Sequence, residues 1–317
     1  MALVLGRCLR RGYCREKKLS LGTPCRQGRE RIVTFTPWRS LGKKTGFTER
    51  SLAETLEGGQ SFLWAKTASG SWLGTWGDNI TELRITSGSL EWRTPKQRTL
   101  ERKEILRYLA IDSEYDAICN SLPWRSDPVL ADAMKRFRGL RILRQPLSET
   151  LFCFLLSSVK SIPQIKDLCL KTAQEFGKEL VPGIHAIPTW ERLAEVAEPD
   201  FRALKFGYRA KYVAATAERI AAEPGFLRNC EAMPYMEARS KLTELPGVGG
   251  KVADCALLFG GAKLEAFPVD TWIAKAMADR YGLGGWSLDQ IASFGRIHFG
   301  PHAGLAQQFL FSAVRAG

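Results

Sequence analysis

The sequence predicts an α+β fold in which a small antiparallel β-sheet domain precedes an all-helical body. Two observations support this prediction. Between residues 46 and 111, short apolar runs alternate with turn residues, and beyond residue 112 apolar residues recur at helical spacing. A chain of 317 residues is long enough to bury a core in each part. We therefore predict a sheet domain over residues 46–111 and a helical domain over residues 112–317.

A basic segment, residues 1–45, precedes both domains. Residues 1–50 contain nine Arg, four Lys and three acidic residues, and thus carry most of the net charge of +13. Residues 1–45 show no sustained periodicity, so we expect a disordered tail; a transit peptide and translation from an upstream start codon are the alternatives. The rest of the chain is nearly balanced in charge. Any surface on it that binds a polyanion must therefore be local.

The strand-like runs of the sheet domain are rich in β-branched and aromatic residues. Clusters such as Ser69-Gly70 and Gly77-Asp78-Asn79 separate them and predict tight turns. Short strands joined in this way form an antiparallel sheet. The four runs are residues 61–65, 71–76, 80–85 and 89–93.

Helices are predicted throughout the second domain. Leu151, Phe154 and Leu155, for example, have the three-and-four spacing of a mostly buried helix face. Pro and Gly punctuate several of the connections. The predicted helices are residues 127–138, 147–158, 162–176, 210–222, 235–245, 250–259, 270–281 and 304–314.

Composition excludes several classes of protein. The eight cysteines form no CxxC pair, and the three histidines complete no zinc spacing with them. We therefore predict no metal site and no disulfide framework, which indicates a reducing compartment. No run approaches the roughly 20 apolar residues that a membrane helix needs. We expect neither a membrane contact nor an organic cofactor.

The most informative motif is Leu-Pro-Gly-Val-Gly-Gly-Lys at residues 245–251, followed nineteen residues later by Asp270. It predicts two helices joined by a glycine hairpin, with Lys251 at the start of the second helix. Backbone amides at such a turn attract a phosphate. Taken alone, Lys251 is simply a solvated lysine and Asp270 an N-cap for the next helix. Both residues together are far more specific for chemistry on DNA.

With these residues the chain resembles the helix-hairpin-helix DNA glycosylases, and in particular the branch that acts on 8-oxoguanine. The resemblance covers about residues 46–317. A lysine at position 251 is similar to that of the bifunctional members, which also cleave the DNA strand. Further matching segments are residues 59–62 with Trp64, residues 144–146 with Glu149 and residues 152–154, residues 207–212, residues 246–255, and Gln307 with residues 310–312.

The resemblance implies a mechanism. The damaged base leaves the duplex, Lys251 attacks the sugar C1′ and forms a Schiff base, and β-elimination then nicks the strand. A lysine amine attacks only in its unprotonated form. Asp270 would stabilise the positive charge that develops on the sugar and assist proton transfers.

The resemblance also implies a base pocket. The carbonyl of Gly59 would accept the N7–H that distinguishes 8-oxoguanine from guanine, and Gln307 would bind the Watson–Crick edge. Phe311 would stack on one face of the base and Cys255 would lie on the other. Without the resemblance these residues would be interpreted as a turn glycine, a solvated amide, ordinary helix core and a packed thiol.

Contacts with the rest of the DNA follow from the same resemblance. Amides of Gly247, Gly249 and Lys251 would face a phosphate, with a monovalent cation as a possible companion. Tyr208 would fill the gap left by the flipped base, and Arg209 would contact the base opposite.

One segment departs from the pattern of the family. Where the family reads the orphaned cytosine with an Asn and an Arg, this chain has Val159 and Gln164, with Lys160 between them. Val159 offers no side-chain hydrogen bond, and Gln164 lacks the guanidinium fork. We therefore predict weak discrimination of the base opposite the lesion. Trp272 similarly replaces a histidine of the family.

The expected partner is double-stranded DNA that contains oxidised guanine, bound by a monomer in the bacterial cytoplasm or nucleoid, or in a eukaryotic nucleus. Two alternatives stay open. The chain could be a glycosylase for another damaged purine, against which Gly59, Gln307 and Phe311 argue. It could also be a non-catalytic helix-hairpin-helix module, against which the retention of Lys251 and Asp270 argues.

Overall fold

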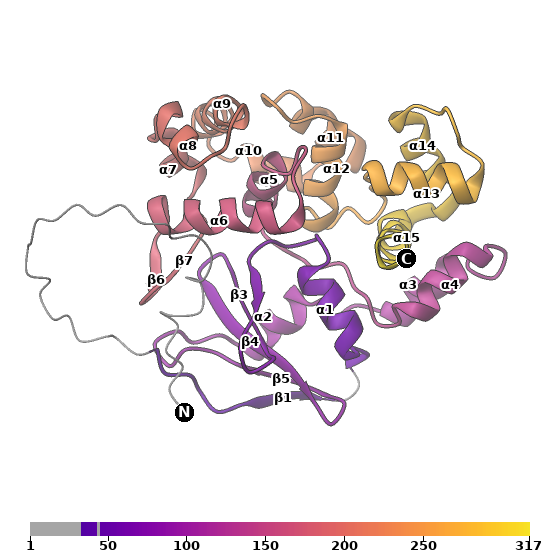
Figure 1. The fold of residues 1–317 in the computed structure, drawn as a ribbon, viewed down its shortest axis with the longest axis horizontal. Helices are drawn as coiled ribbons and strands as arrows, with labels where there is room; N and C mark the ends of the chain where they lie inside the picture. The colour runs from indigo at the N-terminus through magenta and orange to yellow at the C-terminus, as the bar shows by residue number, and fades with distance from the viewer. Residues whose placement is uncertain (1–32, 43–44) are drawn as a thin grey trace, which may run out of the picture.

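The computed structural model describes residues 33–42 and 45–317, and it shows a small sheet with two helices below a larger helical body (Figure 1). The sheet has five antiparallel strands in the order β1-β5-β4-β3-β2. The strands are β1 (Arg39–Gly42), β2 (Trp64–Lys66), β3 (Trp72–Trp76), β4 (Asn79–Thr86) and β5 (Ser89–Arg93). The α+β prediction is confirmed.

Aromatic side chains form the core of the sheet domain. The indole of Trp64 donates a hydrogen bond to the Tyr108 hydroxyl at 2.9 Å, and Trp76 stacks on Tyr108 with ring centroids 4.1 Å apart. Tyr108 ends helix α2 (Arg102–Tyr108), and α1 (Glu49–Glu57) contributes Leu52 and Leu56 to the same core. The sheet therefore buries one face against these two helices, neither of which the sequence patterns predicted.

The predicted extent of the disordered tail is wrong for residues 33–42. Strand β1 pairs with β5, and Trp38 lies 4.0 Å from the Arg84 guanidinium and 4.4 Å from that of Arg93. This edge strand has four residues, of which Leu41 alone is buried, so no alternating pattern could reveal it. Residues 1–32 and 43–44 of the predicted tail lie outside the described residues.

The helical body contains all eight predicted helices, four of them with slightly shorter bounds. Two, α6 and α12, have the predicted bounds because proline or glycine marks their ends. The helices are α3 (Tyr115–Ser121), α4 (Pro128–Arg136), α5 (Leu147–Leu155), α6 (Ile162–Phe176), α7 (Trp190–Ala194), α8 (Glu198–Ala203), α9 (Arg209–Ala221), α10 (Phe226–Ala232), α11 (Tyr235–Thr243), α12 (Gly250–Phe259), α13 (Thr271–Tyr281), α14 (Leu288–Phe299) and α15 (Ala303–Ala316), with a short hairpin β6 (Glu179–Val181) and β7 (Ile184–His185) and a 3₁₀ turn η2 (Gly300–His302).

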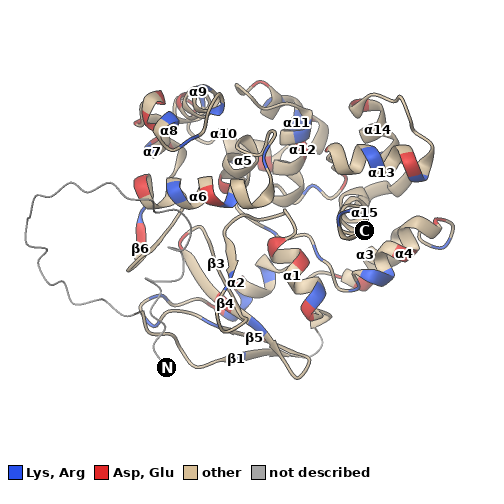
Figure 2. Ribbon diagram, in the orientation of Figure 1, with Lys and Arg blue, Asp and Glu red and all other residues tan. Residues whose placement is uncertain are grey.

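Helix α5 lies at the centre of this body. Every residue from Leu147 to Leu155 is buried except Ser148, and the helix packs against α12. Basic and acidic residues are interspersed along the outer helices, for example on α6 and α13 (Figure 2). Among the described residues, no helix combines the length and apolar character needed to cross a bilayer.

Candidate active site

One cleft of about 890 Å³ lies where the α5–α6 connection, α12, the start of α13 and α15 meet the loop after α1. The catalytic and base-pocket residues predicted from the sequence all line it: Lys251, Asp270, Gly59, Cys255, Gln307 and Phe311. Because Gly59 and Phe311 are far apart in the chain, only the folded protein brings this set together.

Lys251 is the second residue of α12, and its side chain is held at the floor of the cleft. Its Nζ lies 3.1 Å from the Ser157 Oγ and 5.1 Å from the centre of the Phe154 ring. The Ser157 hydroxyl itself donates to the Phe154 carbonyl at 2.7 Å, so Lys251 is the donor to Ser157. Two contacts thus fix the position of the amine. Sequence reasoning missed Ser157, because nothing in its own segment indicates its distance from residue 251.

Asp270 and Cys255 line the same cleft, Asp270 from the start of α13 and Cys255 from the helix that also carries Lys251. One carboxylate oxygen of Asp270 accepts the Ile273 amide at 2.9 Å, so this residue is the N-cap of α13 as the sequence predicted. The cap fixes the carboxylate at the edge of the cleft. Cys255 follows Lys251 by one helical turn and therefore shares its face of α12. Burial raises the pKa of the Cys255 thiol to about 12, so the thiol is neutral at physiological pH.

Gly59 forms the opposite wall of the cleft. Its φ of +108° lies in a region that favours glycine, and a Cβ there would lie 3.1 Å from the Ile162 Cδ1 and 3.8 Å from the Phe311 ring. The neighbouring Gln60 holds this loop in place. Its side chain donates to the Arg141 carbonyl at 2.7 Å and accepts the Leu143 amide at 2.9 Å. The Gly59 backbone therefore faces the cleft in a fixed conformation.

Gln307 is buried, contrary to the solvated amide that its position alone would suggest. Its Nε2 donates to the Pro268 carbonyl at 3.1 Å, and its Oε1 accepts from Gln308 at 2.9 Å. These bonds orient the amide and leave one N–H and one lone pair unused. A donor and an acceptor side by side match the edge of a purine base.

The hairpin between α11 and α12 lies outside the cleft. Gly247 has a φ of +77°, and a Cβ there would approach Tyr212 at 2.7 Å. At Gly249 a Cβ would meet nothing within 4 Å, so the backbone before α12 is open to an incoming group. This arrangement is compatible with phosphate binding at the N-terminus of α12, which also carries Lys251.

The residues predicted to contact the opposite strand have different environments. Lys160 lines the cleft, and Tyr208 is half exposed at the start of α9. Arg209, in contrast, is 4% exposed, and its guanidinium lies 4.4 Å from the centre of the Tyr208 ring. A contact between Arg209 and the base opposite would therefore require the side chain to move outward, and it stays a prediction. Gln164 lies outside the cleft, and its Oε1 accepts the Ser161 amide as part of a capping box.

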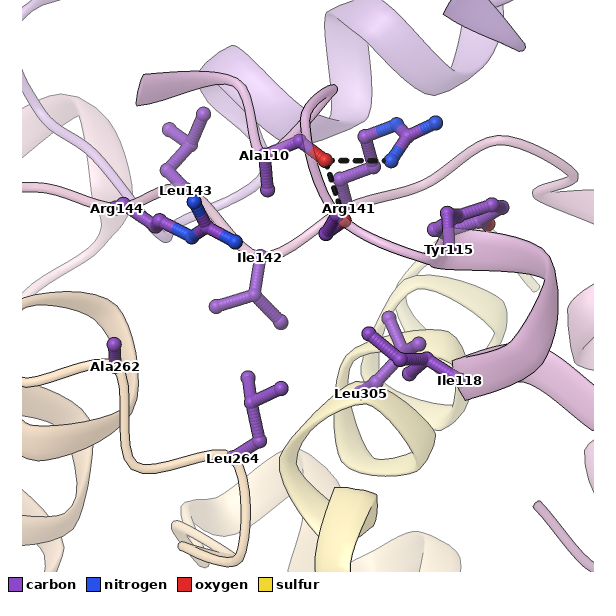
Figure 3. A pocket seen from close by; sticks show the side chains of 11 residues that line it. Ala110, Tyr115, Ile118, Arg141, Ile142, Leu143, Arg144, Ala262, Leu264 and Leu305 are labelled. Atoms are coloured by element: carbon purple, nitrogen blue, oxygen red, sulfur yellow. Dashed lines mark hydrogen bonds between the residues drawn. The ribbon is translucent and has the colours of Figure 1, made fainter. Parts of the chain in front are cut away.

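A second cavity, of about 140 Å³, lies between the segment after α2, the segment before α5 and the side of α15 (Figure 3). The labelled side chains show that its walls are mostly apolar. Arg141 borders it, and its guanidinium donates to the carbonyls of Ala110 and Thr45. This cavity contains none of the site residues predicted from the sequence.

Two family profiles match the chain in succession. The profile of the 8-oxoguanine DNA glycosylase N-terminal domain matches residues 45–151, and that of the HhH-GPD superfamily base excision DNA repair proteins matches residues 154–293. The first covers the segment from α1 to the middle of α5, with strands β2 to β5, and the second covers the end of α5 to residue 293 in α14.

Individual relatives agree with these profiles. The Arabidopsis thaliana N-glycosylase/DNA lyase OGG1 is 33% identical in an alignment of 304 positions that covers 88% of this chain and 81% of that protein. The N-glycosylase/DNA lyase of Saccharomyces cerevisiae is 30% identical over 72% of this chain and 67% of its own length. A crystal structure of the Clostridium acetobutylicum 8-oxoguanine glycosylase/lyase, in complex with double-stranded DNA containing cytosine opposite 8-oxoG, has a TM-score of 0.78 and 32% identity over 84% of this chain and 92% of that one.

Proposed function

The chain belongs to the 8-oxoguanine DNA glycosylase family, and we propose that it excises 8-oxoguanine from double-stranded DNA and then cleaves the strand as a lyase. The observation that carries the proposal is the single cleft that gathers Lys251, Asp270, Gly59, Gln307 and Phe311. Binding of the DNA backbone alone does not require an amine and a carboxylate in one cleft, which argues against a non-catalytic DNA-binding module. The family profile over residues 45–151 argues against a glycosylase for another purine.

In the proposed chemistry, Lys251 is the nucleophile. Its unprotonated amine attacks C1′, the bond from C1′ to the base breaks with its electron pair, and the base leaves with a proton. Opening of the sugar ring converts the adduct into a protonated imine. Loss of a C2′ proton then expels the 3′ phosphate, and water hydrolyses the imine. Asp270 stabilises the positive charge at the sugar during the first step.

The flipped base would lie between Phe311 and Cys255. The neutral Cys255 thiol presents a polarisable, uncharged surface to one face of the base. The Gly59 carbonyl would accept the N7–H of 8-oxoguanine, and the free N–H and lone pair of Gln307 would bind its Watson–Crick edge. Guanine lacks the N7–H, and its N7 lone pair would be repelled by the lone pairs of the Gly59 carbonyl oxygen.

We further propose a weak preference for the base opposite the lesion. Val159 offers no hydrogen bond, Gln164 is occupied in the cap of α6, and Arg209 is buried. The open backbone at Gly249 would hold a phosphate, with a monovalent cation as its companion. The protein would work as a monomer wherever genomic DNA lies, in a nucleoid or a nucleus.

Borohydride trapping tests the proposal. The protein is incubated with duplexes that contain one 8-oxoguanine opposite C or opposite A, and Lys251→Gln is the matched control. A covalent adduct that disappears in the variant is expected. Base release without an adduct would remove Lys251 from the role of nucleophile, and absence of both reactions would contradict the proposed substrate. If excision opposite C exceeds excision opposite A by more than about 100-fold, the scale of two or three hydrogen bonds, the proposed weak preference for the opposite base is contradicted.

A further inference from the structure

Three exposed apolar side chains line the cleft that holds Lys251. Val159 is 92% exposed, Leu288 55% and Trp272 46%, although exposed apolar side chains usually occur singly rather than around one cleft. Val159 lies in the α5–α6 connection, Leu288 at the start of α14 and Trp272 at the start of α13. The mouth of the cleft is therefore an apolar rim, which we define as these three residues.

Trp272 is the central residue of the apolar rim. It lies two positions after Asp270, whose side chain caps the same helix, so the backbone that carries the indole is anchored beside the proposed catalytic carboxylate. The next residue, Ile273, is fully buried, and the helix therefore cannot rotate to cover the indole without exposing its own core. A large aromatic side chain is thus partly exposed beside the site.

Val159 is held outward by its backbone. Its φ of +53° is unusual for a β-branched residue, and the Lys160 amide bond to the Ser157 carbonyl, at 3.2 Å, closes the turn that maintains it. The folded protein therefore keeps an apolar side chain in solvent at a conformational cost. Such strain at the mouth of a cleft indicates a surface shaped for a ligand.

The ligand that suits the apolar rim is the face of a nucleobase. Phosphates bind cations and backbone amides, whereas base faces stack on aromatic and apolar side chains. In a duplex these faces are covered by the neighbouring base pairs, and uncovering one costs a few kcal/mol. In a single strand they are available at once. The apolar rim therefore matches an unstacked base better than a paired one.

Building on the proposed function, we propose that Trp272 stacks on the base adjacent to the lesion, and that this contact lets the enzyme excise 8-oxoguanine from single-stranded DNA. Val159 and Leu288 border the same base. The complementary strand contributes little, because Val159 and Gln164 make no specific contact with an opposite base. The damaged base still enters the pocket between Phe311 and Cys255.

Single-turnover excision from one oligonucleotide, with and without its complement, tests this proposal. The unmodified protein should cleave the single strand within about tenfold of the duplex. Trp272→Ala should lower single-strand excision by roughly 5- to 150-fold, the range for loss of one base–aromatic stack, and should lower the ratio of single-strand to duplex excision by at least about fivefold. Trp272→Phe retains a stacking face and should restore most of this ratio.

Trp286→Ala is the matched control. Trp286 is equally exposed at 46%, but it lies outside the cleft and packs edge-on against Phe294, so the ratio should stay unchanged. Excision from duplex alone by the unmodified protein would overturn the inference and leave the proposed function standing. An unchanged ratio in Trp272→Ala would also overturn it. Excision from neither substrate would overturn the proposed function, and the inference with it.

Discussion

Ser157 has the most direct contact with the proposed nucleophile. Because its hydroxyl hydrogen is donated to the Phe154 carbonyl, Ser157 is the acceptor in its hydrogen bond with Lys251. Ser157→Ala should leave the amine less well positioned and lower the single-turnover trapping rate by about fivefold, which corresponds to loss of one hydrogen bond of about 1 kcal/mol. The dissociation constant for DNA should not change. Ser157→Thr keeps the hydroxyl and should recover the rate, and equal losses in both variants would refute the positioning role.

A substitution at Gly59 allows recognition of the base to be tested separately from the chemistry at the sugar. In Gly59→Ala the added methyl would require a strained backbone and would lie 3.1 Å from the Ile162 Cδ1, on the Phe311 side of the pocket. We expect a loss of about 1–3 kcal/mol in the free energy of unfolding. Excision of 8-oxoguanine should fall at least tenfold.

Trapping on a duplex with a preformed abasic site provides the internal control for Gly59→Ala. An abasic sugar places no base in the pocket, so its trapping rate should change far less than excision. Parallel losses on both substrates would show that Gly59 affects the whole fold rather than the base pocket.

At the scale of elements, the hairpin between α11 and α12 gives two glycines with opposite expected effects. Gly247→Ala meets Tyr212 and forces a residue with Cβ into positive φ, so the melting temperature should fall by several degrees. Gly249→Ala meets no atom of the protein and should melt as the parent does. It should nevertheless weaken binding to duplex DNA, because the methyl occupies the open space at the start of α12. Unaltered affinity in Gly249→Ala would exclude this space as the phosphate site.

The elements show which features a single sequence reveals. Helix α12 and its Lys251 were predictable, because glycines mark the start of the helix and the apolar spacing continues behind it. Strand β1 and helices α1 and α2 were not predicted, since each is short and is stabilised by tertiary contacts with the sheet core. The burial of Arg209 likewise depends on its neighbour Tyr208 and on packing. Local patterns and motifs therefore predicted the residues that line the cleft better than the short elements and buried side chains around them.

At the scale of the molecule, the site depends on docking of the sheet domain onto the helical body. Gly59 belongs to the first and Lys251 to the second, so the cleft exists only while the two are joined. Glu54 of α1 accepts a hydrogen bond from Ser312 and pairs with Arg315 of α15 near the cleft. A second contact joins the two domains: the Glu149 carboxyl of α5 accepts a hydrogen bond from the Gly77 amide of the β3–β4 turn at 2.7 Å.

The Glu149 contact makes the stability of the docked protein depend on pH. Burial raises the pKa of Glu149 to about 7, and the Gly77 amide offsets only part of this effect. A carboxyl with a raised folded-state pKa stabilises the fold most when it is protonated. Its contribution is therefore complete below about pH 4.5 and is lost as the pH rises through 7. The full change is about 3 kcal/mol.

Glu149→Gln is uncharged at every pH and can still accept the Gly77 amide, so the variant should be more stable than the parent protein at pH 8 and nearly equal to it at pH 5. Thermal unfolding of both proteins at the two pH values measures the difference. Glu149 and Glu191 both line a cavity of about 410 Å³, and Glu191 is exposed, so Glu191→Gln should shift neither value. If Glu149→Gln instead destabilises the protein equally at both pH values, the carboxyl is ionised throughout and the docking contact is an ordinary charged hydrogen bond.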